Sequence, residues 1–433
     1  MSEESSNGRL LRTLGTPGAV LLGLGAIIGT GIYVSIGLAA GVAGAAIVPA
    51  LALAAFVAGC NGLSSAQLAA THPVSGGTYE YGYHYLNHWL GFTAGWLFLI
   101  AKGASAATAA LGFAGYLRSL GGIETAWQTP IALALVVTMT VIVLTGLRST
   151  SRVNAGIVVI SIGALLVFMA IAIPNAWDNR TRFVADVIPT DAEGTAALLH
   201  AAALMFVAFT GYGRVATLGE EVVAPRQTIP RAIIWTVLVS FLLYVAVAAA
   251  AVGATGASEL GAAARQGLPL SWAAEQLGNP AVANIVAVGA LIAMAGVLLN
   301  LILGLSRVIL AMARRQDMPT LFSKLNAAST SAPAAVLVVG VVIAVIVLLG
   351  NIKSAWSFSA FTVLLYYAIT NLAALRVPDA DRFVPRVATI AGLIGCLGLA
   401  WFVEKRIWFI GLGIIAVGLV WHGVARRRLK TNS

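Results

Sequence analysis

The residues that could carry out bond chemistry are few, and their positions do not favour catalysis. The chain has 16 acidic residues, five histidines and two cysteines. The acidic residues fall in predicted loops or at the ends of apolar segments, and the histidines show no metal-ligand spacing. Cys60 and Cys396 both lie within apolar stretches, which predicts neither a disulfide framework nor a metal site. We therefore expect no catalytic residues, no bound metal and no cofactor, and a membrane enzyme is the least favoured function.

One ionisable residue, Lys102, stands near the centre of an apolar segment. Placing a charge at that depth costs roughly 2.5–3.5 kcal/mol on insertion scales, so such a residue is a functional candidate. Burial disfavours the charged ammonium, which would suit a proton carrier. Alternatively, the side chain extends to the interface or caps a freed backbone carbonyl without titrating. The sequence leaves these alternatives open.

Two glycine-interrupted segments could bind a zwitterion through the backbone. Gly29 and Gly31 flank Thr30 in the first apolar segment, and Gly211 and Gly213 interrupt the sixth. A helix that breaks at mid-membrane frees N–H groups for a carboxylate and C=O groups for an ammonium. Glycine allows the break and the close approach of a ligand. The alternatives are a packing face of small residues or a kink without a ligand.

The composition indicates which elements must position these groups. Apolar residues make up 59% of the 433 residues and charged residues 10%, whereas globular proteins have roughly 45–50% and 25%. Windows of about twenty apolar residues predict transmembrane helices. We predict twelve, at roughly 17–42, 45–70, 89–118, 129–147, 153–174, 195–217, 231–254, 279–312, 333–350, 354–375, 387–403 and 406–424. The polar start of the chain lacks the features of a cleaved signal, so we expect the first segment to be retained.

The net charge of +10 does not predict a nucleic-acid partner. Basic residues cluster in short loops, as in Arg314–Arg315 and at residues 426–430, without the interleaved aromatics of a base-stacking surface. Most of the basic residues fall on one side of the predicted helices, which places both termini in the cytoplasm. We expect an integral protein of a bacterial inner membrane, surrounded by the lipid bilayer. The sequence does not predict an oligomeric state.

Four motifs together resemble the amino acid–polyamine–organocation superfamily. They are Gly29-Thr30-Gly31-Ile32 in the first segment, Pro73 to Tyr81 after the second, Phe206 to Ile233 around the sixth (with Gly219-Glu220-Glu221-Val222 and Ala224-Pro225-Arg226), and Ser306 to Pro319 at the end of the eighth. The resemblance implies an all-α fold of the leucine-transporter type, a five-plus-five inverted repeat with helices 1 and 6 unwound. Residues 17–174 would form the first repeat and 195–375 the second, with two additional helices at 387–424.

The resemblance also implies a secondary active transporter of amino acids that works by alternating access. The substrate carboxylate would meet the amides of Thr30 and Gly31, and the amine would meet carbonyl groups of both broken helices. Phe206 or Phe209 would form an aromatic lid. The expected substrate-binding residues are Ile27, Ile28, Gly29, Thr30, Gly31, Phe206, Ala208, Phe209, Thr210 and Gly211.

Two departures from the family pattern affect coupling. Gly213 stands where many relatives carry an acidic residue, and Ser161 stands where cationic amino acid transporters carry a lysine. We hypothesise that Lys102 replaces that lysine, as a support for the first helix or as the carrier of a coupled proton. Proton coupling and exchange both remain open.

Neutral amino acids are favoured as substrates, because no mid-membrane carboxylate is available for a cationic side chain and Lys102 would repel one. Acidic amino acids remain open, since Lys102 could attract them. The alternatives are a transporter of another small solute on the same fold (a nucleobase, a polyamine or a cation) and an amino acid sensor. Glu220 and Glu221 are expected to pair with Arg226 and Arg231 on the inner side. Two tyrosines at 366 and 367 either gate the outer vestibule or pack.

Overall fold

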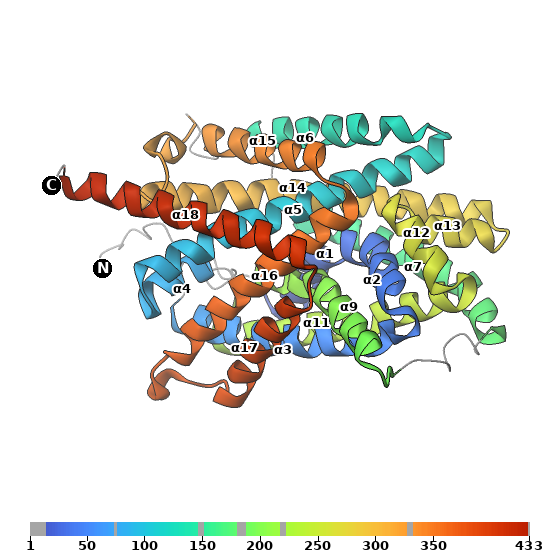
Figure 1. Cartoon of the computed structure of the whole chain (residues 1–433), viewed down its shortest axis with the longest axis horizontal. Helices are drawn as coiled ribbons and strands as arrows, with labels where there is room; N and C mark the ends of the chain where they lie inside the picture. Colours follow the sequence, from blue (N-terminus) through green and yellow to red (C-terminus); the bar gives the residue numbers. More distant parts are fainter. Residues whose placement is uncertain are drawn as a thin grey trace, which may run out of the picture.

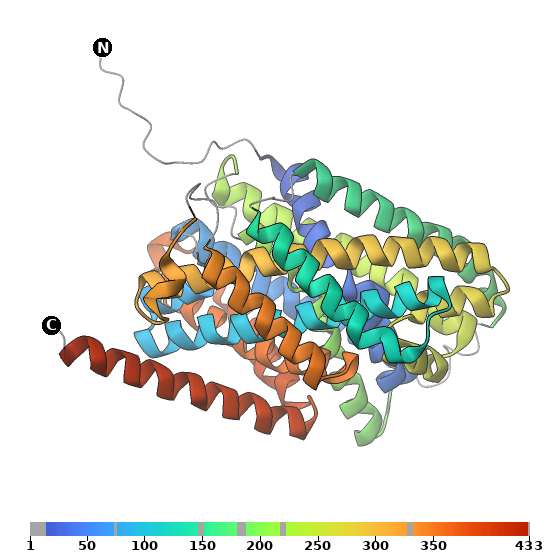
Figure 2. The ribbon, with the colours of Figure 1, turned by 90° about the horizontal axis from the view of Figure 1, so that it is seen from above.

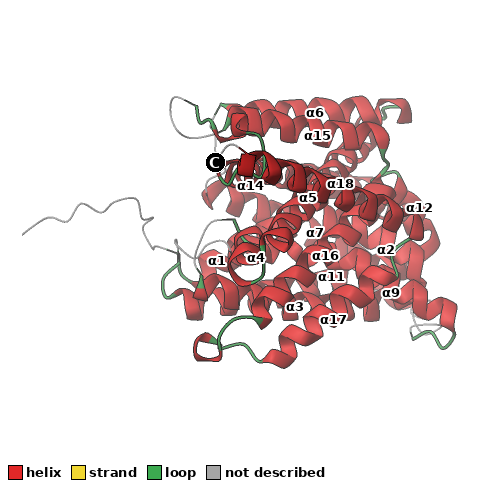
Figure 3. Ribbon diagram, turned by 60° about the vertical axis from the view of Figure 1, so that its left-hand side comes forward, coloured by secondary structure: helices red, strands yellow, loops and turns green. Residues whose placement is uncertain are grey.

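The computed structural model describes residues 14–72, 76–145, 151–179, 188–216, 222–326 and 332–431, although not the side chains of residues 151 and 428–431. Within these ranges the secondary structure is helical and contains no strand (Figure 3). The long helices are α1 (Thr16–Ile27), α2 (Ile36–Ala43), α3 (Ile47–Thr71), α5 (His88–Gly121), α6 (Gln128–Leu144), α7 (Ser151–Asp178), α9 (Ala192–Phe209), α11 (Pro225–Thr255), α14 (Pro280–Arg314), α15 (Pro333–Leu349), α16 (Ile352–Leu375), α17 (Arg386–Trp401) and α18 (Lys405–Thr431). The N-terminal residues 1–13, the motif residues Pro73–Ser75 and Gly219–Glu221, and Arg148 lie outside the described residues.

Nine helical stretches in the described part of the chain are long and apolar enough to cross a membrane. Three shorter apolar helices, α1, α15 and α17, add to them. Together they overlap the twelve predicted segments, and the protein is a polytopic helical membrane protein. Its twelve-segment topology stays a prediction.

Two groups of helices surround the middle of the molecule. In one, α3 packs against α9, α11 and α17, and α1 packs against α11. In the other, α5 packs against α14 and α16, and α14 packs against α7. Helices α6 and α15 lie side by side at one edge (Figure 1). Helix α18 lies on the periphery, where it contacts α5 and α16 (Figure 2).

The two ends of the molecule are distinguished by short helices (Figure 1). Helix α4 (Thr78–Tyr85) lies at one end, together with the C-terminal end of α18. Helices α12 (Ala257–Arg265) and α13 (Pro269–Gln276) lie at the other. Following the predicted orientation, we call the first the inner end and the second the outer end.

The peripheral helices expose large apolar side chains. Leu349 of α15 is 83% exposed, Phe409 of α18 is 77% exposed and Val137 of α6 is 60% exposed. In water such surfaces would drive aggregation, whereas hydrocarbon is their natural solvent. This distribution agrees with a protein surrounded by lipid.

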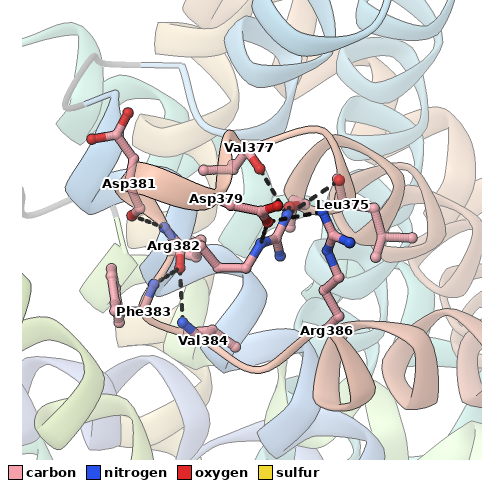
Figure 4. Close-up of polar contacts among 10 residues, drawn as sticks. Leu375, Val377, Asp379, Asp381, Arg382, Phe383, Val384 and Arg386 are labelled. Carbon is pink, nitrogen blue, oxygen red and sulfur yellow. Dashed lines mark hydrogen bonds and ion pairs between the residues drawn. The ribbon is translucent and has the colours of Figure 1, made fainter.

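The inner end of α16 is capped by an arginine from the loop that follows it (Figure 4). Arg382 donates from Nη2 to the carbonyl oxygens of Ala374, Leu375 and Val377, at 3.2, 3.2 and 2.8 Å. The last carbonyls of a helix have no partner within the helix, and a cation there also interacts favourably with the helix dipole. Arg382 therefore fixes the end of α16 to the loop that leads to α17.

A glutamine of α3 holds the same loop from the other side. The Gln67 side chain accepts hydrogen bonds from the N–H groups of Phe383 (2.8 Å) and Val384 (2.9 Å), and it donates to the carbonyl of Asp381 at 2.9 Å. Close by, Arg226 lies 3.9 Å from the Asp381 carboxylate. The loop between α16 and α17 is thus tied to α3. The predicted partners of Arg226, Glu220 and Glu221, are outside the described residues.

Candidate functional site

The first helix is interrupted where the sequence places its glycines. Helix α1 ends at Ile27, and Ile28 has an extended backbone (φ −75°, ψ 104°). A π-helical turn then covers Gly31–Ser35 and leads into α2. The first N–H groups of a new helical segment have no partner within it. The Thr30 hydroxyl is buried and has no hydrogen-bond partner among the described residues.

The interruption in the sixth predicted segment is smaller. Helix α9 ends at Phe209, a 3-10 turn covers Thr210–Tyr212, and the short helix α10 (Gly213–Ala216) follows directly. The Thr210 hydroxyl donates to the carbonyl of Val207 at 2.6 Å. The backbone changes its helix type here but does not become extended.

The two interruptions touch each other through glycines. A Cβ atom on Gly211 would lie 2.6 Å from the carbonyl oxygen of Ala26, and one on Gly31 would lie 2.6 Å from the Cβ of Ala208. Both distances are shorter than real Cβ contacts. Only glycine allows the helices to approach this closely, so the two motifs form one centre rather than two separate kinks.

Tyr244 of α11 bridges both interrupted helices, although no sequence motif points to it. Its hydroxyl lies 2.9 Å from the carbonyl oxygen of Ile27 and 3.3 Å from that of Ala208. Its ring packs against Phe209, with the centroids 5.1 Å apart. The one available signal was a lone hydroxyl in the apolar run Phe241–Val245. That signal says nothing of a partner on two other helices.

Lys102 of α5 reaches the second interruption. Its Nζ donates to the Thr210 hydroxyl at 2.7 Å, and within the described ranges it makes no ion pair with a carboxylate. One turn further along α5, the Ser105 hydroxyl lies 2.7 Å from that of Ser359 on α16. Helices α5, α9 and α16 are thus joined by polar contacts beside the interruptions.

Ser161 lies elsewhere and contacts the first helix. Its hydroxyl donates to the carbonyl of Ile157 at 2.7 Å. Its own carbonyl accepts from the Tyr33 hydroxyl at 2.8 Å. The two predicted coupling residues therefore contact different interrupted helices, Lys102 the second and Ser161 the first.

The candidate lid residues pack against tyrosines. Phe206 is fully buried, with its ring edge-to-face against Tyr367 at a centroid separation of 5.6 Å. The Tyr367 hydroxyl donates to the carbonyl of Thr210 at 3.4 Å. The neighbouring Tyr366 points towards α4, where a Cβ on Gly77 would lie 3.5 Å from its hydroxyl. The two tyrosines therefore lie between the second interruption and α4.

Glycine-interrupted helices that meet inside a helical membrane protein are typical of secondary transporters. The chain belongs to the amino acid permease family, within the amino acid–polyamine–organocation superfamily, because the sequence profile of that family matches residues 14–424. The predicted resemblance is confirmed. The family consists of membrane transporters rather than enzymes.

Among curated proteins, the chain is similar to an uncharacterised transporter of Mycobacterium tuberculosis, with 38% identity over 98% of this chain and 94% of the relative. It is also similar to the methylthioribose transporter of Bacillus subtilis, with 29% identity over 100% of this chain and 97% of the relative. A third relative is the branched-chain amino acid permease BcaP of Bacillus subtilis, with 31% identity over 74% of this chain and 71% of the relative.

Proposed function

We propose that the chain is a secondary active transporter of neutral amino acids that works by alternating access. The observation that carries this proposal is the contact between the two interrupted helices, where Ile28 is extended next to the unpaired Thr30 hydroxyl and the described side chains in contact carry no carboxylate. The similarity to a branched-chain amino acid permease supports an apolar side chain in the substrate.

The proposed substrate position follows from the charges of the backbone. The amino acid carboxylate would accept from the N–H groups of Thr30 and Gly31, where a helical segment begins. The free Thr30 hydroxyl is a further donor for it. The amine would lie near the carbonyls of the Ile27–Ile28 and Phe206–Phe209 segments. It would compete there with the Tyr244 hydroxyl, which already bonds Ile27.

Lys102 is proposed to couple transport to protons. Its Nζ contacts Thr210, so any change in its charge acts directly on the second interruption. A protonated Lys102 would also repel a cationic side chain in the site, which favours neutral substrates over arginine or lysine. If Lys102 keeps one protonation state throughout, it acts as a support for the second interruption and the transporter is an exchanger.

The inverted-repeat fold is part of the same proposal. The two interruptions occur in the first segment of residues 17–174 and in the first segment of residues 195–375, as two related halves require. The pairing of α5 with α6 is matched by the pairing of α14 with α15. The helices at 387–424 would then be additions to the ten-helix core.

The test is uptake of radiolabelled amino acids into proteoliposomes, with and without an inward proton gradient. Gradient-driven uptake of leucine, isoleucine or valine, and no uptake of arginine, is the expected result. Uptake only into vesicles preloaded with amino acid would indicate an exchanger. If no amino acid is transported in either condition, the proposed substrate class is wrong.

One specific observation favours a second candidate substrate. One relative, aligned over 100% of this chain, is named a methylthioribose transporter. Methylthioribose has no ionisable group. A site without a carboxylate would suit such a solute as well. Radiolabelled methylthioribose therefore belongs in the same uptake panel, where transport of it alone would replace the amino acid proposal.

A further inference from the structure

A buried carboxylate at the inner end joins three parts of the chain that are far apart in sequence. Asp317 follows α14 and is only 4% exposed. Its Oδ2 accepts hydrogen bonds from the hydroxyls of Tyr79 and Tyr83, both at 2.6 Å, and both tyrosines belong to α4. Its Oδ1 lies 3.1 Å from Nδ1 of His422 on α18. Burying an isolated carboxylate costs free energy, and the hydrogen bonds and the charge of these partners offset that cost for Asp317.

The two phenols are permanent donors to this carboxylate. Burial, and then the hydrogen bond to Asp317, raises the pKa of Tyr79 and of Tyr83 well above the usual range. Each hydroxyl therefore keeps its proton at any physiological pH. The hydrogen bonds from α4 to Asp317 are therefore not lost through deprotonation of the two tyrosines.

An ion pair also joins α4 to the segment that follows α14. Arg315 pairs with Glu80 through two guanidinium nitrogens. The Arg315 guanidinium carbon also lies 4.5 Å from the centroid of the Tyr83 ring, a cation–π distance. Tyr79, Glu80 and Tyr83 thus attach one face of α4 to the residues that follow α14.

The C-terminal helix supports Asp317 from the opposite side. His422 is fully buried and its ring stacks on Phe92 of α5, with the centroids 4.4 Å apart. His422 Nδ1 has an ion-pair distance to Asp317 but not the direction of an aligned hydrogen bond. The neighbouring Trp421 donates from Nε1 to the carbonyl of Asp317 at 3.0 Å. Further along, Trp96 of α5 donates to a carbonyl of α18 at 2.9 Å, so α18 is firmly attached.

Helix α4 also packs against α16, the helix whose Tyr367 contacts the second interruption. The Thr78 hydroxyl, at the start of α4, lies 2.8 Å from that of Thr370 on α16. Thr370 is fully buried and lies one turn beyond Tyr366 and Tyr367. A substrate that left the Thr210 region towards the inner end would meet these tyrosines first and α4 next.

We propose that Asp317 is the hub of a lock that keeps α4 closed over the inner end of the transport path, and that His422 on the C-terminal helix sets how easily the lock opens. The lock consists of Tyr79, Glu80, Tyr83, Arg315, Asp317 and His422. Such a lock has a role only if the chain opens to both sides as a transporter, as proposed above.

The test measures access to Thr370 from the inner side and needs no substrate. The chain has two cysteines, so a parent protein with Cys60→Ser, Cys396→Ser and Thr370→Cys carries a single thiol under α4. Inside-out membrane vesicles are treated with a membrane-impermeant maleimide. We expect Asp317→Asn to raise the labelling rate about tenfold, and His422→Phe, which keeps an aromatic ring against Phe92, to raise it about threefold.

Asp381→Asn is the matched control, because it removes a carboxylate at the same end of the molecule whose ion pair with Arg226 is exposed and 3.9 Å long. Its labelling rate should equal that of the parent. Tyr83→Phe removes one hydrogen bond and keeps the ring, so it replaces Asp317→Asn if that variant does not fold. Unchanged labelling in Tyr83→Phe and His422→Phe would overturn the lock. Faster labelling in a protein that transports no amino acid would leave the lock standing and reject the proposed substrate.

Discussion

Polar groups around Thr30 and Lys102 at the centre of the molecule differ in their partners from Asp317 and Gln67 at its inner end. At the centre, the Thr30 hydroxyl has no partner among the described residues, and the ammonium of Lys102 meets a hydroxyl rather than a carboxylate. At the inner end, the Asp317 carboxylate is surrounded by two phenols and an imidazole, and every polar atom of the Gln67 side chain is bonded.

The difference indicates what each region is for. A buried polar group without a partner costs free energy, and native proteins keep few of them. Such groups are tolerable where a ligand will complete their hydrogen bonds. Fully bonded polar clusters instead specify one arrangement of the chain. Substitutions at the centre should therefore impair transport more than stability, and substitutions at the inner end should do the reverse or change gating.

The strongest expected effect at the centre is that of Lys102→Ala. We expect gradient-driven accumulation to fall about a hundredfold, while exchange persists, because the ammonium that would carry the proton is lost. The measurement is uptake into proteoliposomes with and without the gradient. Lys353→Ala is the control, since Lys353 forms an exposed ion pair with Glu404 at the outer end. Accumulation that still depends on pH in Lys102→Ala would rule out the proton role.

A methyl group at Gly211 should separate the two interrupted helices. The added Cβ would meet the carbonyl of Ala26. Overpacking of about 2 kcal/mol corresponds to roughly a thirtyfold loss of transport rate. Gly163→Ala on α7 is the matched control, because no atom lies within 4 Å of its Cβ position. Equal transport by both variants would show that close contact between the interruptions is not needed.

Tyr244→Phe should have a more moderate effect. The variant keeps the ring against Phe209 and removes only the hydroxyl that bridges Ile27 and Ala208. Losing one such hydrogen bond costs about 1 kcal/mol, so we expect KM to change about fivefold with a normal amount of folded protein. Thr255→Val is the control, because it removes a hydroxyl that bonds the Ala251 carbonyl within the same helix. If Tyr244→Phe had the KM of the wild type, the hydrogen bonds of the Tyr244 hydroxyl would have no role in substrate binding.

The sequence was sufficient for the class of fold and for the location of the interruptions. Apolar windows located most helices within a few residues, because a helix that spans lipid needs a run of about twenty apolar residues. Helix α11 begins six residues earlier and α18 ends seven residues later than predicted, where polar and charged residues extend the helix beyond the apolar run. The glycines flanking Thr30 marked a real change of backbone, with Ile28 extended. At Gly211 the backbone does not become extended, because a 3-10 turn leads directly into α10.

The partners of the polar residues could not be predicted from the sequence. Tyr244 contacts Ala208, which is more than thirty positions away in the sequence. Lys102 contacts Thr210, which is more than a hundred positions away. No local pattern encodes such a pairing. The Asp317 cluster was missed for the same reason. Its members lie in α4, in the segment after α14 and in α18, and only tertiary packing brings these three parts of the chain together. The placement of Tyr366 and Tyr367 on the inner side also depends on how α16 rotates against α4.

The smallest expected effect on transport, and the clearest on stability, comes from Gln67→Leu at the inner end. The variant would leave the N–H groups of Phe383 and Val384 without their acceptor, at about 1–3 kcal/mol for each buried group. We expect a lower thermal unfolding temperature in detergent and uptake within about twofold of wild type. Gln67→Glu keeps an acceptor for both N–H groups but replaces the donor to Asp381 with an ionisable carboxyl oxygen, so it should also lower the unfolding temperature. Gln276→Leu, exposed at the outer end, should change neither quantity. Loss of uptake at unchanged stability in Gln67→Leu would contradict this prediction. That result would make the loop between α16 and α17 a moving part of the transport cycle. The hydrogen bonds of Gln67 would then serve transport, like the polar groups at the centre, and not stability.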